Sequence, residues 1–269
     1  MNIIQKIKTL FNHFKSFQNN HKTNIPLSYN NVDLAEQLFN SQTLGGYIDD
    51  KYSSQVNAIL KECTPVDSKY PERQQVLLKI IEMIGEPKTP KERYIIAISY
   101  AWSRVEYREK AIYYLNLYLN NELYVNIYAH RKYGLSSNIS LKENEKHHLI
   151  EMYDYLAKAY IGIYDFNKAL AVGEKMININ PNDQRGYFVK TEILSKQGKL
   201  QECKTWLEQI KTSPYYKIQI YYDVLGRKIE DSYFCKAIDR LLEDTENKIK
   251  KNYIYKPKIH SNKKEKGVN

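Results

Sequence analysis

Residues 164–183 of this 269-residue chain read YDFNKALAVGEKMININPND. The stretch starts with an aromatic-led turn, continues as a helical run with alanine set between larger apolar residues, and ends near a proline. Small residues let a second helix approach closely, and proline ends a helix because it lacks a backbone N–H donor. The fold depends on whether this unit stands alone or is repeated.

The same arrangement of residue types recurs further along the chain, at an interval of about 34 residues. A helical period of about 3.6 residues does not divide this interval evenly, so two unrelated amphipathic helices would not share this register. We therefore interpret residues 150–183 and 184–215 as two copies of one unit. The pairs at this spacing are Tyr153 and Tyr187, Tyr160 and Leu194, Phe166 and Leu200, Ala169 and Cys203, Gly173 and Leu207, and Met176 and Ile210, while Pro181 and Pro214 are closer by a single position.

The unit resembles the tetratricopeptide repeat (TPR), a pair of antiparallel helices of about 34 residues with the pattern W-x-x-L-G-x-x-Y…A…F…A…P. The first copy departs from this pattern at Gly173 and Met176, and the second has Lys190 where a leucine is expected. The resemblance implies an all-α fold, a TPR-like solenoid of helical hairpins. The matching residues are Tyr153, Leu156, Ala157, Tyr160, Ala169 and Pro181 in the first copy, and Tyr187, Leu194, Cys203 and Leu207 in the second.

A third, degenerate copy is predicted at 92–123. Trp102 aligns with Tyr160 and Ala111 with Ala169 at one common spacing, which is longer than a single repeat and requires an insertion between the copies. The segment ISYAWSRVEYREKAIYYLNLYL has apolar residues at i, i+3, i+4 and i+7, so we expect two helices joined by a short turn. The insertion is placed at 124–149.

Helix boundary signals support a helical chain. Pro71 and Pro90 are each expected at the first position of a helix, where a missing N–H costs nothing. Gly85 follows a helical run as a C-terminal cap. Ser140 and Glu143 form a capping-box pattern that predicts the start of a long helix.

The remaining segments complete the predicted organisation. Residues 19–31 are expected to be a linker, and residues 32–89 an irregular helical region broken by LGGY and CTPVDSKYP. The repeat domain then covers 90–250. No run with strand periodicity exceeds a few residues, so we expect YYKIQIYYDVLGRKI and SYFCKAIDRLLEDTENKIKK to form capping helices at 216–250.

The formal net charge of +10 is concentrated at the two ends of the chain. Residues 247–269 contain eight lysines and one acid, and residues 1–22 contain four lysines and no acid, which leaves −1 for residues 23–246. We expect 251–269 to be a basic disordered tail, because low hydrophobicity with high charge favours disorder. The tail either serves solubility or attaches weakly to nucleic acid or an acidic partner.

Residues 1–18 predict a basic amphipathic helix with one apolar stripe. Such a short helix is marginal in water, so the surface that covers the stripe must also stabilise the helix. Three interpretations stay open: the helix docks on its own fold, enters a partner's groove, or lies through residues 1–17 on an anionic membrane surface. The stripe consists of Ile3, Ile4, Ile7, Leu10, Phe11, Phe14 and Phe17.

The composition indicates where in the cell the protein is expected. No apolar run approaches the roughly 18–20 residues of a membrane span, and no signal-peptide pattern is found. Cys63, Cys203 and Cys235 are odd in number and lack C-x-x-C spacing, so we expect reduced core thiols in a cytoplasmic protein. The abundance of Lys, Asn, Ile and Tyr is typical of an AT-rich bacterial or phage genome.

Signatures of enzymes are missing from the sequence. No histidine is spaced for metal binding, and the adjacent His147 and His148 point about 100° apart on a helix, so we expect both to be exposed. No phosphate-binding glycine motif and no G-x-S-x-G is found. We therefore expect no catalytic residue, no metal and no cofactor.

The resemblance assigns a binding role to the concave face formed by the first helix of each unit. The residues it places there are Asp154, Lys158 and Ile161 in the first copy, and Phe188, Glu192 and Ser195 in the second. This mixed-charge, partly apolar set suits an amphipathic or charged peptide. We therefore expect a non-enzymatic scaffold that binds a protein or peptide. The alternatives are a peptide-responsive regulator whose N-terminal region acts on nucleic acid or a response protein, and a peripheral membrane adaptor.

Overall fold

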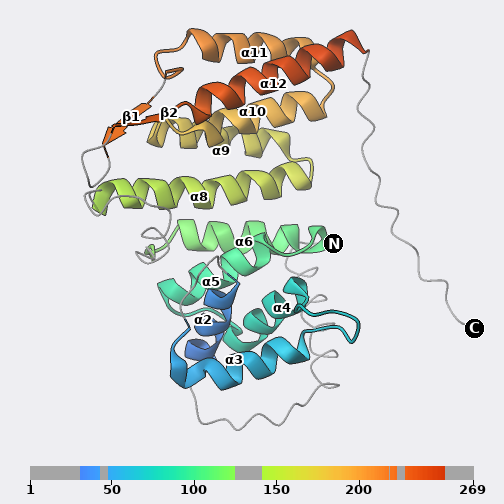
Figure 1. Cartoon of the computed structure of the whole chain (residues 1–269), viewed down its shortest axis with the longest axis vertical. Helices are drawn as coiled ribbons and strands as arrows, with labels where there is room; N and C mark the ends of the chain where they lie inside the picture. Colours follow the sequence, from blue (N-terminus) through green and yellow to red (C-terminus); the bar gives the residue numbers. More distant parts are fainter. Residues whose placement is uncertain (1–30, 43–47, 125–140, 218, 223–227, 252–269) are drawn as a thin grey trace, which may run out of the picture.

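The computed structural model describes residues 31–42, 48–124, 141–217, 219–222 and 228–251 (Figure 1). The helix expected at 1–18, the linker except for Asn31, most of the insertion, and the tail from residue 252 onward therefore lie outside the described residues. The same holds for LGGY at 44–47.

The described part of the chain is all-α, as predicted, apart from one small hairpin of two strands. The elements are α2 (Asn31–Ser41), α3 (Asp50–Glu62), α4 (Arg73–Ile84), α5 (Pro90–Ala101), the 3-10 turn η1 (Val105–Tyr107), α6 (Arg108–Leu119), α8 (Leu141–Gly162), α9 (Phe166–Ile179), α10 (Gln184–Lys196), α11 (Leu200–Thr212), β1 (Gln219–Tyr222), β2 (Lys228–Asp231) and α12 (Tyr233–Lys250).

The helices follow the predicted units closely. The first copy, 150–183, holds the end of α8 and all of α9, and the second, 184–215, holds α10 and α11. Helices α9 and α11 begin at Phe166 and Leu200, which the sequence aligns as equivalent positions of the two copies. The insertion ends earlier than expected, because α8 begins at Leu141 rather than after residue 149. This start agrees with the capping-box pattern in the sequence.

The first capping helix is a wrong prediction. Strands β1 and β2 pair antiparallel, with Gln219 opposite Asp231 and Tyr222 opposite Lys228. The physical reason is a sequence pattern with a period of two. Ile218, Ile220 and Tyr222 occupy every second position, with one polar residue and Tyr221 between them, and β-branched and aromatic residues at this spacing favour a strand. The second capping helix is confirmed as α12, which ends at Lys250.

The helix boundaries confirm two of the three Pro and Gly signals. Thr89 caps α5 by accepting a hydrogen bond from the Glu92 N–H at 3.2 Å, and Pro90 is the first helical residue. Gly85 ends α4 with φ = 66°, which favours glycine. The expectation for Pro71 is wrong by two residues, because α4 begins at Arg73. Glu72 occupies the N-cap position instead.

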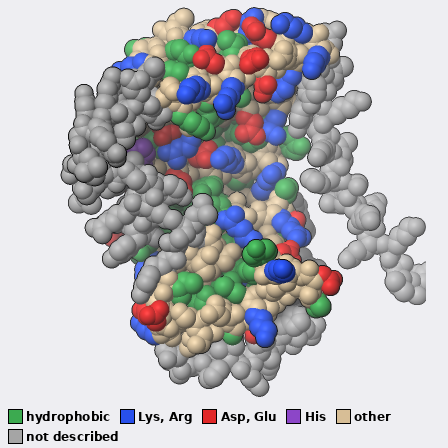
Figure 2. Space-filling model, viewed as in Figure 1, with side chains coloured by type: hydrophobic (Ala, Val, Ile, Leu, Met, Phe, Trp, Pro, Cys, Tyr) green, Lys and Arg blue, Asp and Glu red, His purple; other side chains and the backbone are tan. Residues whose placement is uncertain are grey.

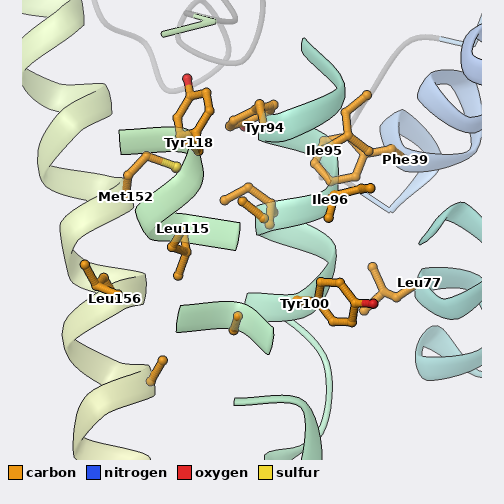
Figure 3. Close-up of a cluster of buried hydrophobic side chains, with 14 of the residues drawn as sticks. Phe39, Leu77, Tyr94, Ile95, Ile96, Tyr100, Leu115, Tyr118, Met152 and Leu156 are labelled. Carbon is orange, nitrogen blue, oxygen red and sulfur yellow. The ribbon is translucent and has the colours of Figure 1, made fainter. Parts of the chain in front are cut away.

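Helix α5 lies at the centre of the larger of two hydrophobic clusters (Figure 3). Its residues from Tyr94 to Tyr100 are all buried, so α5 is covered on every side. One side faces α6 and α8, where Tyr118 and Met152 lie, and the other faces α2 and α4, where Phe39 and Leu77 lie (Figure 3). Helices α2, α3 and α4 therefore share one core with α5 and the helices that follow it.

Helix α10 separates this cluster from a second one. Its Val189 and Ile193 belong to the first cluster, whereas Tyr187 and Leu194 belong to the second. Helix α8 contacts α6, α9 and α10, and the contacts continue from α10 to α11 and from α11 to α12 (Figure 1). The second cluster is completed by Cys203, Leu207, Ile210, Phe234 and Ile238.

Candidate functional site

The structure brings three of the six predicted binding residues to one hollow. Lys158 and Ile161 from α8 and Glu192 from α10 line a space of about 300 Å³. Ile161 is buried and forms part of the floor, while Glu192 and Lys158 are exposed. We call this the α8–α10 hollow. Its other lining residues are Arg108, Gly162, Tyr164 and Lys196.

Arg108 is fixed in the hollow by the end of α8. Its Nη1 donates a hydrogen bond to the carbonyl oxygen of Gly162 at 2.7 Å. A cation at this position also complements the negative end of the α8 helix dipole. A Cβ on Gly162 would lie 2.2 Å from the guanidinium, so a larger residue there would displace the flexible end of Arg108 from this position. The first residue of α6 thus contacts the C-terminal end of α8.

The hollow carries three cations and one carboxylate among its described lining residues. Lys196 Nζ lies 3.6 Å from the Glu192 carboxylate, one turn away on α10. Lys158 Nζ lies 2.6 Å from the carboxylate of Asp154, the fourth predicted residue, which stands beside the hollow rather than in its lining. Each pair has one exposed member, Lys158 or Glu192, so solvent screens the pair and the exposed side chain can exchange it for a contact with a ligand.

The same face is more acidic toward the start of α8. Arg185 binds Asp183 through two side-chain hydrogen bonds of 2.6 and 2.9 Å, and the half-buried Glu151 lies nearby. Burial raises the pKa of Glu151, although Arg185 opposes this effect. Burial would also raise the pKa of Asp183, but the hydrogen bonds and charge of Arg185 lower it overall. The face is thus polarised, with cations concentrated at the end of α8.

Figure 2 shows how basic and acidic side chains are distributed on the surface. Blue and red side chains are interleaved across the middle of the view, at the height of α8 to α10 in Figure 1. The last two predicted residues do not line the hollow. Phe188 is half-buried and packs against the second hydrophobic cluster, and Ser195 is half-buried on α10.

One histidine expected at the surface is buried. His148 is 1% exposed, and its Nε2 lies 2.6 Å from the hydroxyl of Tyr118. The expectation was wrong because His148 stands one helical turn before the buried Met152 and so lies on the inner stripe of α8. His147, by contrast, is half-buried. Among the described residues, no group of His, Cys, Asp and Glu is placed to hold a metal ion.

Two further expectations concern the state of the cysteines and the presence of a membrane-spanning helix. Cys63, Cys203 and Cys235 are free thiols, and Cys203 is buried beside Thr191 and Thr245. Burial raises the pKa of the Cys203 thiol, which disfavours the reactive thiolate. Within the described ranges, every helix is too short or too polar to span a bilayer.

Sequence reasoning missed Arg108, Gly162 and Lys196. Arg108 is far from Gly162 in the chain, and no local pattern links them. Lys196 follows Glu192 by one turn, a spacing that indicates an ion pair but not a site.

Comparison with protein-family models, with curated proteins and with solved structures finds no match for this chain.

Proposed function

We propose that this chain is a TPR-like helical-repeat protein without catalytic activity, which binds another protein or a peptide through the face formed by α8 and α10. The repeated spacing of the helix pairs supports the repeat assignment. Stacked helix pairs bury a continuous core and leave a broad face for recognition. We further propose a cytoplasmic location, which the three free cysteine thiols suit.

The observation that carries the proposal is the α8–α10 hollow. Equivalent turns of two repeat copies place Lys158, Ile161 and Glu192 around one space, although Glu192 belongs to a different copy from the other two. Arg108 adds a third helix to the same space. Cations over an apolar floor, next to an acidic stretch, suit a peptide that carries both charges and an apolar anchor.

A second candidate is a regulator in which peptide binding alters the region before residue 90. The observation that favours it is the shared core, since α5 packs against α2 and α4 on one side and against α6 and α8 on the other. A change in the packing of α6 or α8 would therefore reach residues 32–85. Deletion of these residues is not a clean test, because it would expose the buried side chains of α5.

Photocrosslinking in the source cell tests the proposal directly. A photoreactive amino acid is placed at Ser195 on α10 in the full chain, and at the exposed Glu62 on α3 as the control. We expect one discrete protein adduct from position 195 and none from position 62. Equal labelling from both positions, or turnover of a small molecule by purified protein without any adduct, contradicts the proposal.

Charge reversal then tests the hollow itself. Once the crosslinked partner is identified, Lys158→Glu should weaken its binding at least about tenfold. The substitution replaces a cation that attracts an acidic group of the partner with an anion that repels it. Glu174→Lys has the reverse change on α9 and should leave the dissociation constant unchanged. Isothermal titration calorimetry measures both, and equal loss in both variants would point to non-specific electrostatics.

A further inference from the structure

A second hollow lies on another flank of α8. Side chains on successive helical residues are about 100° apart, so Tyr153, Leu156 and Tyr160 project well away from Lys158 and Ile161. These three residues line a groove of about 190 Å³, whose sides are formed by α6 and α9. We call it the α6–α9 groove. Because its lining residues differ entirely from those of the α8–α10 hollow, the two are separate sites.

Aromatic rings and ammonium groups alternate along this groove. Lys168 Nζ lies 5.5 Å from the centre of the Tyr160 ring, and Lys175 Nζ lies 5.8 Å from the Tyr153 ring. The two tyrosines on α8 and the two lysines on α9 are each two helical turns apart, which corresponds to about 10 Å along a helix. An extended peptide rises about 3.3 Å per residue, so the groove matches three to four residues of such a peptide.

The other side of the groove supplies amide groups. Asn116 Nδ2 donates hydrogen bonds to the Ile112 carbonyl at 2.8 Å and to the Tyr160 hydroxyl at 3.3 Å. The Tyr160 hydroxyl accepts this bond, which leaves its own proton for an acceptor such as a carboxylate. Asn120 follows one turn later on α6 and is exposed in the groove lining.

The charge of the groove has one sign. Its described lining includes two lysines and two asparagines but no aspartate or glutamate. Lys168 pairs with Asp165 at 2.7 Å, just outside the lining, and both side chains of the pair reach solvent. Lys175 is exposed on α9. A ligand that brings carboxylates would therefore meet ammonium groups, an amide and a phenol, and would compete with Asp165 for Lys168.

The chain's own longer segments outside the described ranges do not have this chemistry. Residues 1–30 and 125–140 contain lysine or arginine but no acid, and 252–269 contains five lysines against one glutamate. Basic segments do not complement the two lysines, so none of these three supplies an acidic occupant.

From these observations we propose that the α6–α9 groove binds a short, extended, acidic segment of another protein. The acidic side chains pair with Lys168 and Lys175, and the backbone or a further carboxylate accepts from Asn120 and from the Tyr160 hydroxyl. The apolar floor of Leu156 and Val172 contacts the stems of these side chains.

Fluorescence anisotropy with the full chain tests the proposal. The probe is a labelled, extended peptide in which glutamate alternates with alanine, and its matched control replaces every glutamate with glutamine. We expect saturable binding of the acidic peptide and at least about tenfold weaker binding of the glutamine peptide. Lys175→Gln should weaken the acidic peptide by a similar factor. Ala171→Leu, which fills the exposed groove lining without changing charge, should do the same.

Two comparisons separate this site from the alternatives. Lys61→Gln, at an exposed lysine of α3 outside both sites, should leave binding of the acidic peptide unchanged. Loss on Lys158→Gln but not on Lys175→Gln overturns the assignment and places acid recognition in the other hollow. Absence of saturable binding overturns it as well. Tighter binding of a single-stranded oligonucleotide, lost in Lys175→Gln, would identify a nucleic-acid site in place of an acidic-peptide site.

Discussion

Two glycines explain how closely α9 and α10 approach. A Cβ on Gly186 of α10 would lie 2.7 Å from Ile177 Cγ1 and 2.9 Å from the carbonyl oxygen of Gly173 on α9. A Cβ on Gly173 would meet the Val189 side chain at 3.1 Å. Gly173 departs from the repeat pattern in the sequence, and this contact supplies the physical reason. The backbones of neighbouring helices meet where neither has a side chain.

The two glycines should respond differently to alanine. Alanine is favoured over glycine within a helix by about 1 kcal/mol, whereas overpacking a core contact costs about 1–3 kcal/mol. Gly186→Ala forces a methyl group against a backbone carbonyl, so we expect a net loss of about 1–2 kcal/mol in the free energy of unfolding. Gly173→Ala meets Val189 at 3.1 Å and the Gly186 carbonyl oxygen at 3.2 Å, which requires shifts of only a few tenths of an ångström, so it should cost less than Gly186→Ala. Urea unfolding measures both, and equal losses would contradict this geometry.

Two carboxylates on the same face have opposite effects on stability as pH changes. The raised pKa of Glu151 means that the folded state binds its proton more tightly than the unfolded chain does, so this group costs stability once it ionises. The lowered pKa of Asp183 has the opposite effect, because the ionised carboxylate stabilises the folded state. Its contribution is present above the ordinary aspartate pKa and is lost as the pH falls through the lower, folded value.

Amide substitutions should reveal both signs. Glu151→Gln should stabilise the protein at neutral pH, and this gain should vanish as the pH falls below the ordinary glutamate pKa. Asp183→Asn keeps a side chain that can cap α10 but removes the charge paired with Arg185, so we expect a loss of about 2 kcal/mol at neutral pH that shrinks in acid. Urea unfolding of each variant and the parent, from about pH 7 to about pH 3, gives the differences. A gain for both variants at neutral pH is incompatible with the pairing seen here.

Among the helices, local sequence signals predicted those of the repeats well and the hairpin poorly. The repeat spacing and Pro90 located α5 and α8 to α11, because helix periodicity and caps are local properties. The segment 216–230 was assigned to a helix by continuity with its neighbours, although Ile220, Tyr221 and Tyr222 are strong strand formers. The prediction of a helix there was wrong because an all-helical chain was expected, and the local strand-forming pattern was given less weight.

The candidate site was only partly predictable for a related reason. The resemblance to the tetratricopeptide repeat implied a shared face for Lys158, Ile161 and Glu192, and these three line one hollow. Arg108 required knowledge of how α6 meets the end of α8, which depends on the path of the chain through the insertion. Burial of His148 was likewise set by the packing of α8 on α5 and α6.

The cap of α5 can be tested separately, and it matters because this helix lies at the centre of the core. Thr89 Oγ1 accepts from the Glu92 N–H at 3.2 Å, and the Glu92 carboxylate accepts from the Lys88 N–H at 2.7 Å. Thr89→Ala should lower the free energy of unfolding by about 1 kcal/mol, because one helix-end donor loses its partner. Thr89→Ser retains the hydroxyl and should cost much less. Thermal unfolding followed by circular dichroism measures both, and an equal loss would assign the effect to the methyl group of Thr89.

The molecule as a whole contains two hydrophobic clusters that meet at α10. The larger joins α2 to α9 and includes Val189 and Ile193, and the smaller joins α10 to α11 and α12. In repeat architectures each unit contacts only its neighbours, so stability is close to a sum of local terms. The end that holds the smaller cluster has fewer buried side chains and should open first.

Hydrogen exchange can establish this order. Leu207 is fully buried in the smaller cluster, and Leu207→Ala should cost about 2–5 kcal/mol there because it removes apolar contacts and leaves a cavity. We expect amide exchange in α11 and α12 to accelerate while α5 and α6 keep their protection. Leu115→Ala, an equally buried position in the larger cluster, is the matched control and should accelerate exchange in α5, α6 and α8. Uniform acceleration along the chain in Leu207→Ala would mean that both clusters unfold as one unit, and that α10 transmits stability between them rather than dividing them.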